Sequence, residues 1–82
     1  MKEKILKLLV KLSPGLGEEE LDFFNQGGSL ISKGVIDSIT LIEFVSLLEL
    51  EFQVELEPND MIIENFQNLE SIVALISKKK EV

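Results

Sequence analysis

The feature that most constrains this fold is an apolar stripe with helical spacing between residues 38 and 52. Apolar side chains recur there at intervals of three and four residues, at Leu41, Phe44, Val45, Leu48 and Phe52. An α-helix has about 3.6 residues per turn, so these five side chains share one face. The spacing predicts a helix over residues 38–52 that packs this face against a core.

Four further helical segments are predicted around this one. Residues 2–12 repeat the same spacing and stop at a Ser-Pro-Gly turn, because proline cannot continue a helical hydrogen-bond ladder. Residues 17–24 form a short helix with acidic side chains at its start, and residues 58–62 form a turn opened by proline. The last helix spans residues 69–79, and Asn68 is its natural cap.

These segments predict an all-α chain, because alternating strand patterns are scarce in it. The simplest arrangement is one domain over residues 1–82, a four-helix bundle with three longer helices, a short third helix and a long loop between the first two. Part of that loop, residues 29–37, is expected to be ordered, and Gly34 marks a turn within it. Its apolar anchors are Leu30, Ile31, Val35 and Ile36.

The composition argues against catalysis by this chain's own side chains. It contains no Cys, His, Arg, Tyr or Trp, so the commonest general base and the thiolate metal ligands are missing. The acidic cluster of Glu55, Glu57 and Asp60 does not match the spacing of an EF-hand loop, and we predict no metal site. A binding, carrier or adaptor role is expected rather than an enzyme.

The charge of the chain is concentrated in its middle. Residues 13–77 hold thirteen acidic side chains and one lysine, whereas residues 1–12 and 78–82 are net positive, for a total of −7. An acidic surface repels nucleic acid and speeds association with partners that have basic surfaces. No apolar run approaches the roughly 18 residues of a membrane span. We therefore expect a cytoplasmic monomer that binds no nucleic acid and does not cross a membrane.

One short segment carries chemistry, because it places Asp37 and Ser38 at the first turn of the strongest helix. Either side chain is a natural N-cap, whose oxygen accepts a hydrogen bond from a free backbone N–H. The Ser38 hydroxyl is expected at the surface, where an attached phosphate would meet free N–H groups and the positive end of the helix dipole. For this pair alone, an ordinary cap is the simpler interpretation.

The context of this pair resembles the acyl carrier protein family. Residues 34–39 are similar to the family's Gly-x-x-Asp-Ser-Leu/Ile motif, and the helix that follows ends in the family's Glu-x-x-Phe, here residues 49–52. The resemblance implies that Ser38 carries 4′-phosphopantetheine, installed from coenzyme A by a phosphopantetheinyl transferase that Asp37 helps to engage. The chain would then hold an acyl or aminoacyl group as a thioester, and would catalyse nothing itself.

The resemblance also implies a docking face for partner enzymes on the helix that follows Ser38. The matching positions are Ile39, Ile42, Glu43 and Ser46. The expected partners are acyl- or aminoacyl-loading ligases or acyltransferases, and downstream synthase enzymes with basic docking surfaces. They would belong to fatty acid, polyketide or nonribosomal peptide biosynthesis. Residues 64–66, Glu-Asn-Phe, are more similar to stand-alone aminoacyl, peptidyl and polyketide carriers than to fatty-acid carriers.

For several apolar side chains, the sequence allows either a place in the core or a functional role. Ile39 is either exposed or packed against the loop before it, whereas Ile42 is expected to be exposed. Met61 and Ile62 are expected in the core or against the prosthetic arm. The phenylalanines assigned to the core are Phe23, Phe24, Phe44, Phe52 and Phe66. The alternative to a carrier is a small acidic helical adaptor without a prosthetic group, in which Ser38 is only a cap.

Overall fold

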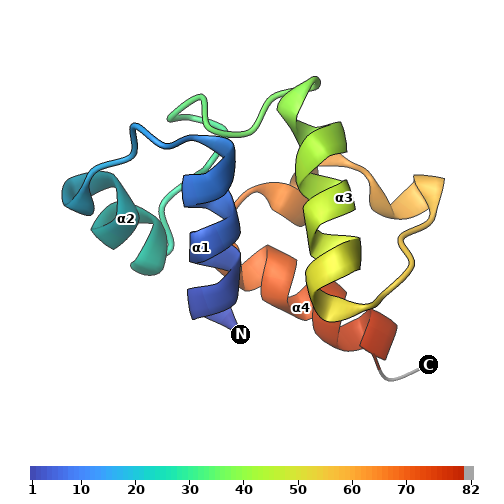
Figure 1. Cartoon of the computed structure of the whole chain (residues 1–82). Helices are drawn as coiled ribbons and strands as arrows, with labels where there is room; N and C mark the ends of the chain where they lie inside the picture. The colour runs from blue at the N-terminus through green and yellow to red at the C-terminus, as the bar shows by residue number, and fades with distance from the viewer. Residues whose placement is uncertain (81–82) are drawn as a thin grey trace.

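The computed structural model describes residues 1–80, and every regular element in that range is helical (Figure 1). The elements are α1 (Lys2–Leu12), α2 (Glu18–Asn25), α3 (Thr40–Phe52), the 3₁₀ turns η1 (Pro58–Asp60) and η2 (Ile63–Phe66), and α4 (Leu69–Lys80). The predicted all-α bundle is confirmed. Within these residues no helix is long and apolar enough to cross a lipid bilayer.

The predicted boundaries are close to the observed ones for α1, α2 and α4, and the Asn68 side chain caps α4 by accepting the Ser71 N–H at 2.8 Å. Two boundaries were wrong. The helix predicted from residue 38 begins at Thr40, because residues 38 and 39 form the turn that leads into it. The turn predicted over residues 58–62 already ends at Asp60, as η1, and the second 3₁₀ turn, η2, was not predicted.

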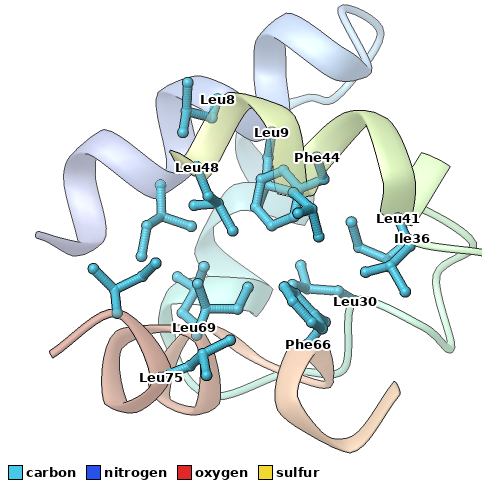
Figure 2. Packing of buried hydrophobic residues seen from close by; sticks show 14 of the residues in the cluster. Leu8, Leu9, Leu30, Ile36, Leu41, Phe44, Leu48, Phe66, Leu69 and Leu75 are labelled. Atoms are coloured by element: carbon cyan, nitrogen blue, oxygen red, sulfur yellow. The ribbon is translucent and has the colours of Figure 1, made fainter. Parts of the chain in front are cut away.

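One apolar core joins α1, α3, α4 and the loop before α3 (Figure 2). The predicted stripe of α3 is buried throughout, and no polar or charged side chain among the described residues is buried with it. Phe44 of α3 meets Phe66 of η2 edge-on, with ring centroids 6.4 Å apart. Each fully buried side chain of this size contributes about 1.5–3 kcal/mol of transfer free energy. The core therefore fixes α3 against the other elements.

The loop before α3 is tied to the core by apolar anchors and backbone hydrogen bonds. The Leu30 N–H donates to the Gln67 carbonyl at 2.8 Å, which links the loop to the chain just before α4. Gly34 has a φ of +74°, so the predicted turn is present at a conformation that glycine adopts without strain. The predicted anchors Leu30, Val35 and Ile36 are buried, and Ile31 is half-buried.

Three apolar side chains assigned to the core or its edge lie elsewhere. Phe23 is 40% exposed, and the Lys33 ammonium lies 5.0 Å from its ring centroid. Phe24 takes the core position of α2, and residues adjacent on a helix point about 100° apart, so Phe23 cannot share it. Met61 and Ile62 are exposed between the two 3₁₀ turns, where Phe66 fills the core instead. The placement of Phe23 in the core was wrong. For Met61 and Ile62 the core alternative is excluded, and contact with the prosthetic arm stays a prediction.

Candidate functional site

The turn before α3 is closed by one carboxylate. Asp37 Oδ1 accepts the N–H groups of Ile39 and Thr40, each at 2.9 Å, and the Asp37 carbonyl accepts the N–H of Leu41. Of the two candidate caps, the structure therefore uses Asp37. Hydrogen bonds from the Thr40 backbone and side chain, and then from the Ile39 backbone, hold the pKa of Asp37 below its ordinary value. Its carboxylate is ionised at neutral pH.

The Thr40 side chain stabilises the same turn, a role that the sequence analysis did not predict. Its hydroxyl oxygen accepts the Asp37 N–H at 2.8 Å, and its proton can go to Asp37 Oδ1 at 3.0 Å or to the Val35 carbonyl at 3.3 Å. The two side chains thus satisfy each other's backbone N–H groups, which is the logic of a capping box. The Asp-x-x-Thr spacing is the sequence signal that would have found this pair.

Ser38 is left free by this arrangement. Its side chain is exposed, and its hydroxyl has no hydrogen-bond partner within residues 1–80. The hydroxyls of two other serines are hydrogen-bonded within the fold. Ser32 donates to the Ser29 carbonyl at 3.2 Å, and Ser46 donates to the Ile42 carbonyl at 3.3 Å. A group can therefore be attached to the Ser38 oxygen without breaking a hydrogen bond of the fold.

Three of the N–H groups expected to meet a phosphate on Ser38 are already occupied. Those of Ile39 and Thr40 donate to the Asp37 carboxylate and that of Leu41 donates to the Asp37 carbonyl, so for these groups the prediction was wrong. What remains near Ser38 is the positive end of the α3 dipole and, beside it, an ionised carboxylate that opposes a second anion. A phosphate on Ser38 would therefore gain no hydrogen bond from the Ile39 or Thr40 N–H groups.

The remaining predicted site residues share the outer face of α3. Ile39 is 73% exposed and Ile42 is 69% exposed, and Glu43 and Ser46 are exposed beside them. The open question for Ile39 is thus settled in favour of exposure. Leu50, which was not singled out as an interface residue, is 79% exposed and follows Ser46 by four residues on the same face. Large apolar side chains gathered on one exposed face are typical of a protein contact.

Residues 64–66 have structural roles in this fold. The Asn65 amide donates to the Asp60 carbonyl at 2.8 Å, and Phe66 is fully buried. Asp60 itself pairs with Lys79 of α4 at 2.6 Å, so its carboxylate is already neutralised by a cation. Among residues 1–80 no cluster of three or more acidic side chains is arranged to hold a metal ion.

The family model for phosphopantetheine attachment sites matches residues 4–76 of this chain. The chain belongs to that family. Its prosthetic group is therefore covalently attached 4′-phosphopantetheine, and the chain is a carrier on which transferases and synthases act. Carrier domains of this kind are generally non-catalytic, and the finding favours the carrier over the adaptor without a prosthetic group. No curated protein and no solved structure matches this chain significantly.

The residues around Ser38 fit a covalently attached phosphate ester. The side chains of Asp37, Ser38 and Ile39 are all exposed, so no neighbour has to move to admit the group. The hydroxyl is a chemically suitable oxygen for a phosphodiester, and the chain offers no thiol of its own.

Proposed function

We propose that this chain is an acyl or aminoacyl carrier protein that bears its 4′-phosphopantetheine on Ser38. The observation that carries the proposal is the exposed, unbonded Ser38 hydroxyl beside a turn that the Asp37 and Thr40 side chains cap without it. When attached, the group supplies a terminal thiol on which the cargo is held as a thioester. The chain supplies the attachment oxygen and the surface that partner enzymes contact.

The residues around Ser38 have separate tasks in this proposal. Asp37 keeps the turn closed, so Ser38 is not needed as a cap and stays available to a transferase. The Asp37 carboxylate is ionised and exposed, and it offers a contact to a basic side chain of that transferase. Thr40 holds Asp37 in place. The fully buried Phe44 anchors α3 in the core, so the helix that follows the attachment oxygen is held in place.

The exposed face of α3 is the proposed docking site for the partners. Its apolar residues fill shallow pockets on an enzyme surface, and Glu43 pairs with a basic side chain there. The partners are a phosphopantetheinyl transferase, a loading ligase or acyltransferase, and downstream synthase enzymes. Tethering raises the effective concentration of the cargo at each of these enzymes in turn. The chain acts in the cytoplasm as a monomer in this proposal.

The intact mass of the protein tests the attachment site. Incubation with coenzyme A and a promiscuous phosphopantetheinyl transferase is expected to add one phosphopantetheine to the wild type and none to Ser38→Ala. Ser32→Ala is the matched control, because it removes a nearby exposed hydroxyl and is expected to be modified fully. A wild type that gains no mass, or a folded Ser38→Ala that still gains it, would refute the proposal.

A further inference from the structure

A groove runs along the contact between α1 and α3. The two helices are antiparallel, because Lys4 reaches Glu51 near the end of α3, whereas Lys11 lies opposite Glu43 near its start (Figure 1). At this second end there is a hollow of about 480 Å³. It is lined by Lys11, Leu12, Ile42, Glu43, Ser46 and Leu47.

A second hollow of about 380 Å³ continues along the same contact. It is lined by Lys4, Lys7, Leu8, Lys11 and Glu51. The two hollows share Lys11, so we treat them as one seam groove that extends from Ile42, one turn after Ser38, toward the end of α3. Its apolar lining comes from Leu8, Leu12, Ile42 and Leu47. The α1 rim consists of three exposed lysines, Lys4, Lys7 and Lys11, whereas the α3 rim carries Glu43 and Glu51.

The two sides of α3 carry opposite charges. Figure 1 shows α3 between α1 and the segment that leads to α4. The α1 helix has a net charge of +3, whereas residues 53–66 contain four acidic side chains and no basic one. The Leu56 N–H donates to Glu49 Oε2 at 2.9 Å, which holds this acidic segment against α3. The outer face of α3 therefore lies between a positively charged helix, α1, and a negatively charged segment, residues 53–66.

We propose that the seam groove is a docking site for a segment of the partner enzyme that carries acidic side chains next to an apolar one. The proposal rests on the carrier function and deepens it, because the outer face of α3 continues into the groove at Ile42. Basic side chains of a partner suit the acidic side of α3, but the α1 lysines repel them. Lys4 already pairs with Glu51, so an acidic segment laid along Lys7 and Lys11 removes that conflict, and it sets the orientation of the enzyme about Ser38.

The charge of the whole chain favours a protein over other anionic partners. Nucleic acid and an anionic membrane are negative over their entire surface, so they would face the acidic remainder of a chain whose net charge is −7. A protein surface can be acidic along the α1 rim and basic beyond α3. The apolar lining of the groove also requires an apolar side chain, which a folded partner supplies.

The test uses ¹⁵N-labelled holo protein and two synthetic helical peptides. Both peptides carry leucines at i and i+4, and they are identical except that Glu in one is replaced by Lys in the other. The acidic peptide is expected to shift the backbone amide resonances of Lys11, Leu12, Ile42, Ser46 and Leu47, and to bind more weakly as salt is added. The basic peptide is expected to leave the α1 side of the seam groove, at Lys7, Leu8 and Lys11, unperturbed.

Charge reversal in the groove supplies the decisive comparison. Lys7→Glu/Lys11→Glu is expected to weaken the acidic peptide by about tenfold or more, because two attractive contacts become repulsive. Lys78→Glu is the matched control, since it reverses an exposed lysine on α4, and it is expected to keep wild-type affinity. All three lysines are exposed, so equal melting temperatures are expected.

Three outcomes would overturn the inference. The first is equal binding of the two peptides, the second is shifts outside the groove, and the third is unchanged affinity in Lys7→Glu/Lys11→Glu. Phosphatidylglycerol vesicles that bind the wild type but not this double variant would assign the lysines to a lipid surface instead. The intact mass is recorded on each sample, so a failure of arm attachment, which refutes the carrier, is distinguished from a failure of groove binding.

Discussion

Leu41 and Ile42 are neighbours in the sequence and similar in size, yet the structure predicts opposite consequences when each is shortened. Leu41 is 9% exposed and belongs to the core, whereas Ile42 is 69% exposed on the outer face of α3. Replacement of each by alanine leaves a good helix former in place, so local helix propensity changes little. The pair therefore separates the stabilising face of α3 from its docking face.

The expected losses of stability differ several-fold. Truncation of a buried leucine to alanine costs about 2–5 kcal/mol, against a total of about 5–15 kcal/mol for a domain. In a chain of this length each kcal/mol shifts Tm by about 4–8 °C, so Leu41→Ala is expected to lower Tm by about 10 °C or more. Ile42→Ala removes a side chain that is mostly in water, and its cost stays within about 0.5 kcal/mol.

For the rate of phosphopantetheine attachment the expected order is the reverse, with a large effect of Ile42→Ala and a small effect of Leu41→Ala. Ile42→Ala is expected to lower kcat/KM for the phosphopantetheinyl transferase by about tenfold, because truncation at an interface hot spot costs about 1–2 kcal/mol. Glu43→Lys is expected to act in the same direction at unchanged Tm, since it turns an attraction for a basic partner into a repulsion. Leu41→Ala, assayed well below its Tm, is expected to be modified at close to the wild-type rate.

Thermal melting and transferase kinetics on the same protein samples decide the matter. If Ile42→Ala melts as low as Leu41→Ala, Ile42 contributes to the core and the assignment of faces on α3 is wrong. If Ile42→Ala and Glu43→Lys are both modified as fast as the wild type, the transferase does not contact this face.

Three further predictions concern the rest of the fold. A Cβ on Gly28 would clash with the Phe23 ring, so Gly28→Ala is expected to lower the stability by about 1–3 kcal/mol. Adding Phe23→Ala to this variant is expected to restore part of the loss. Gly15→Ala is the neutral control in the same thermal melts, because a Cβ on Gly15 would contact no other atom. The hydrogen bond from Lys79 lowers the pKa of Asp60, so the stabilisation from this pair is complete above the ordinary pKa of 3.8 and is lost as the pH falls through the lower native pKa. Asp60→Asn is therefore expected to flatten that part of an acid-denaturation curve, and an unchanged curve would contradict this prediction. Added NaCl is expected to raise Tm at neutral pH, because it screens the repulsion within the acidic middle of the chain, and a Tm that stays flat or falls would show that this repulsion is negligible.

The burial pattern of α3 could be read from the sequence because it follows from local geometry. The buried stripe that includes Leu41, Phe44 and Leu48 is where a period of 3.6 residues places it. The Gly34 turn and the Asn68 cap were predictable for the same reason, since each depends on a few adjacent residues. The Asp37–Ser38 pair at the start of α3 was also found from local context.

The positions that were wrong depend on competition between neighbours for one core. Phe23 and Phe24 are equally apolar, and the orientation of α2 decided which of them is buried. Met61 and Ile62 are exposed, whereas Phe66 from the same stretch of chain is buried and packs on Phe44. Such choices depend on shapes brought together from distant parts of the chain, which no local pattern contains.

The sequence by itself determined that this chain is helical, acidic and devoid of Cys, His, Arg, Tyr and Trp, because these properties follow from composition and from local periodicity. It also located the serine on which the proposed function depends. The Asp-x-x-Thr spacing is also local, but the structure was needed to show that Asp37 and Thr40 together close the turn and leave the Ser38 hydroxyl free. The structure alone also placed the α1 lysines beside the outer face of α3, because the packing of two helices far apart in sequence creates the seam groove.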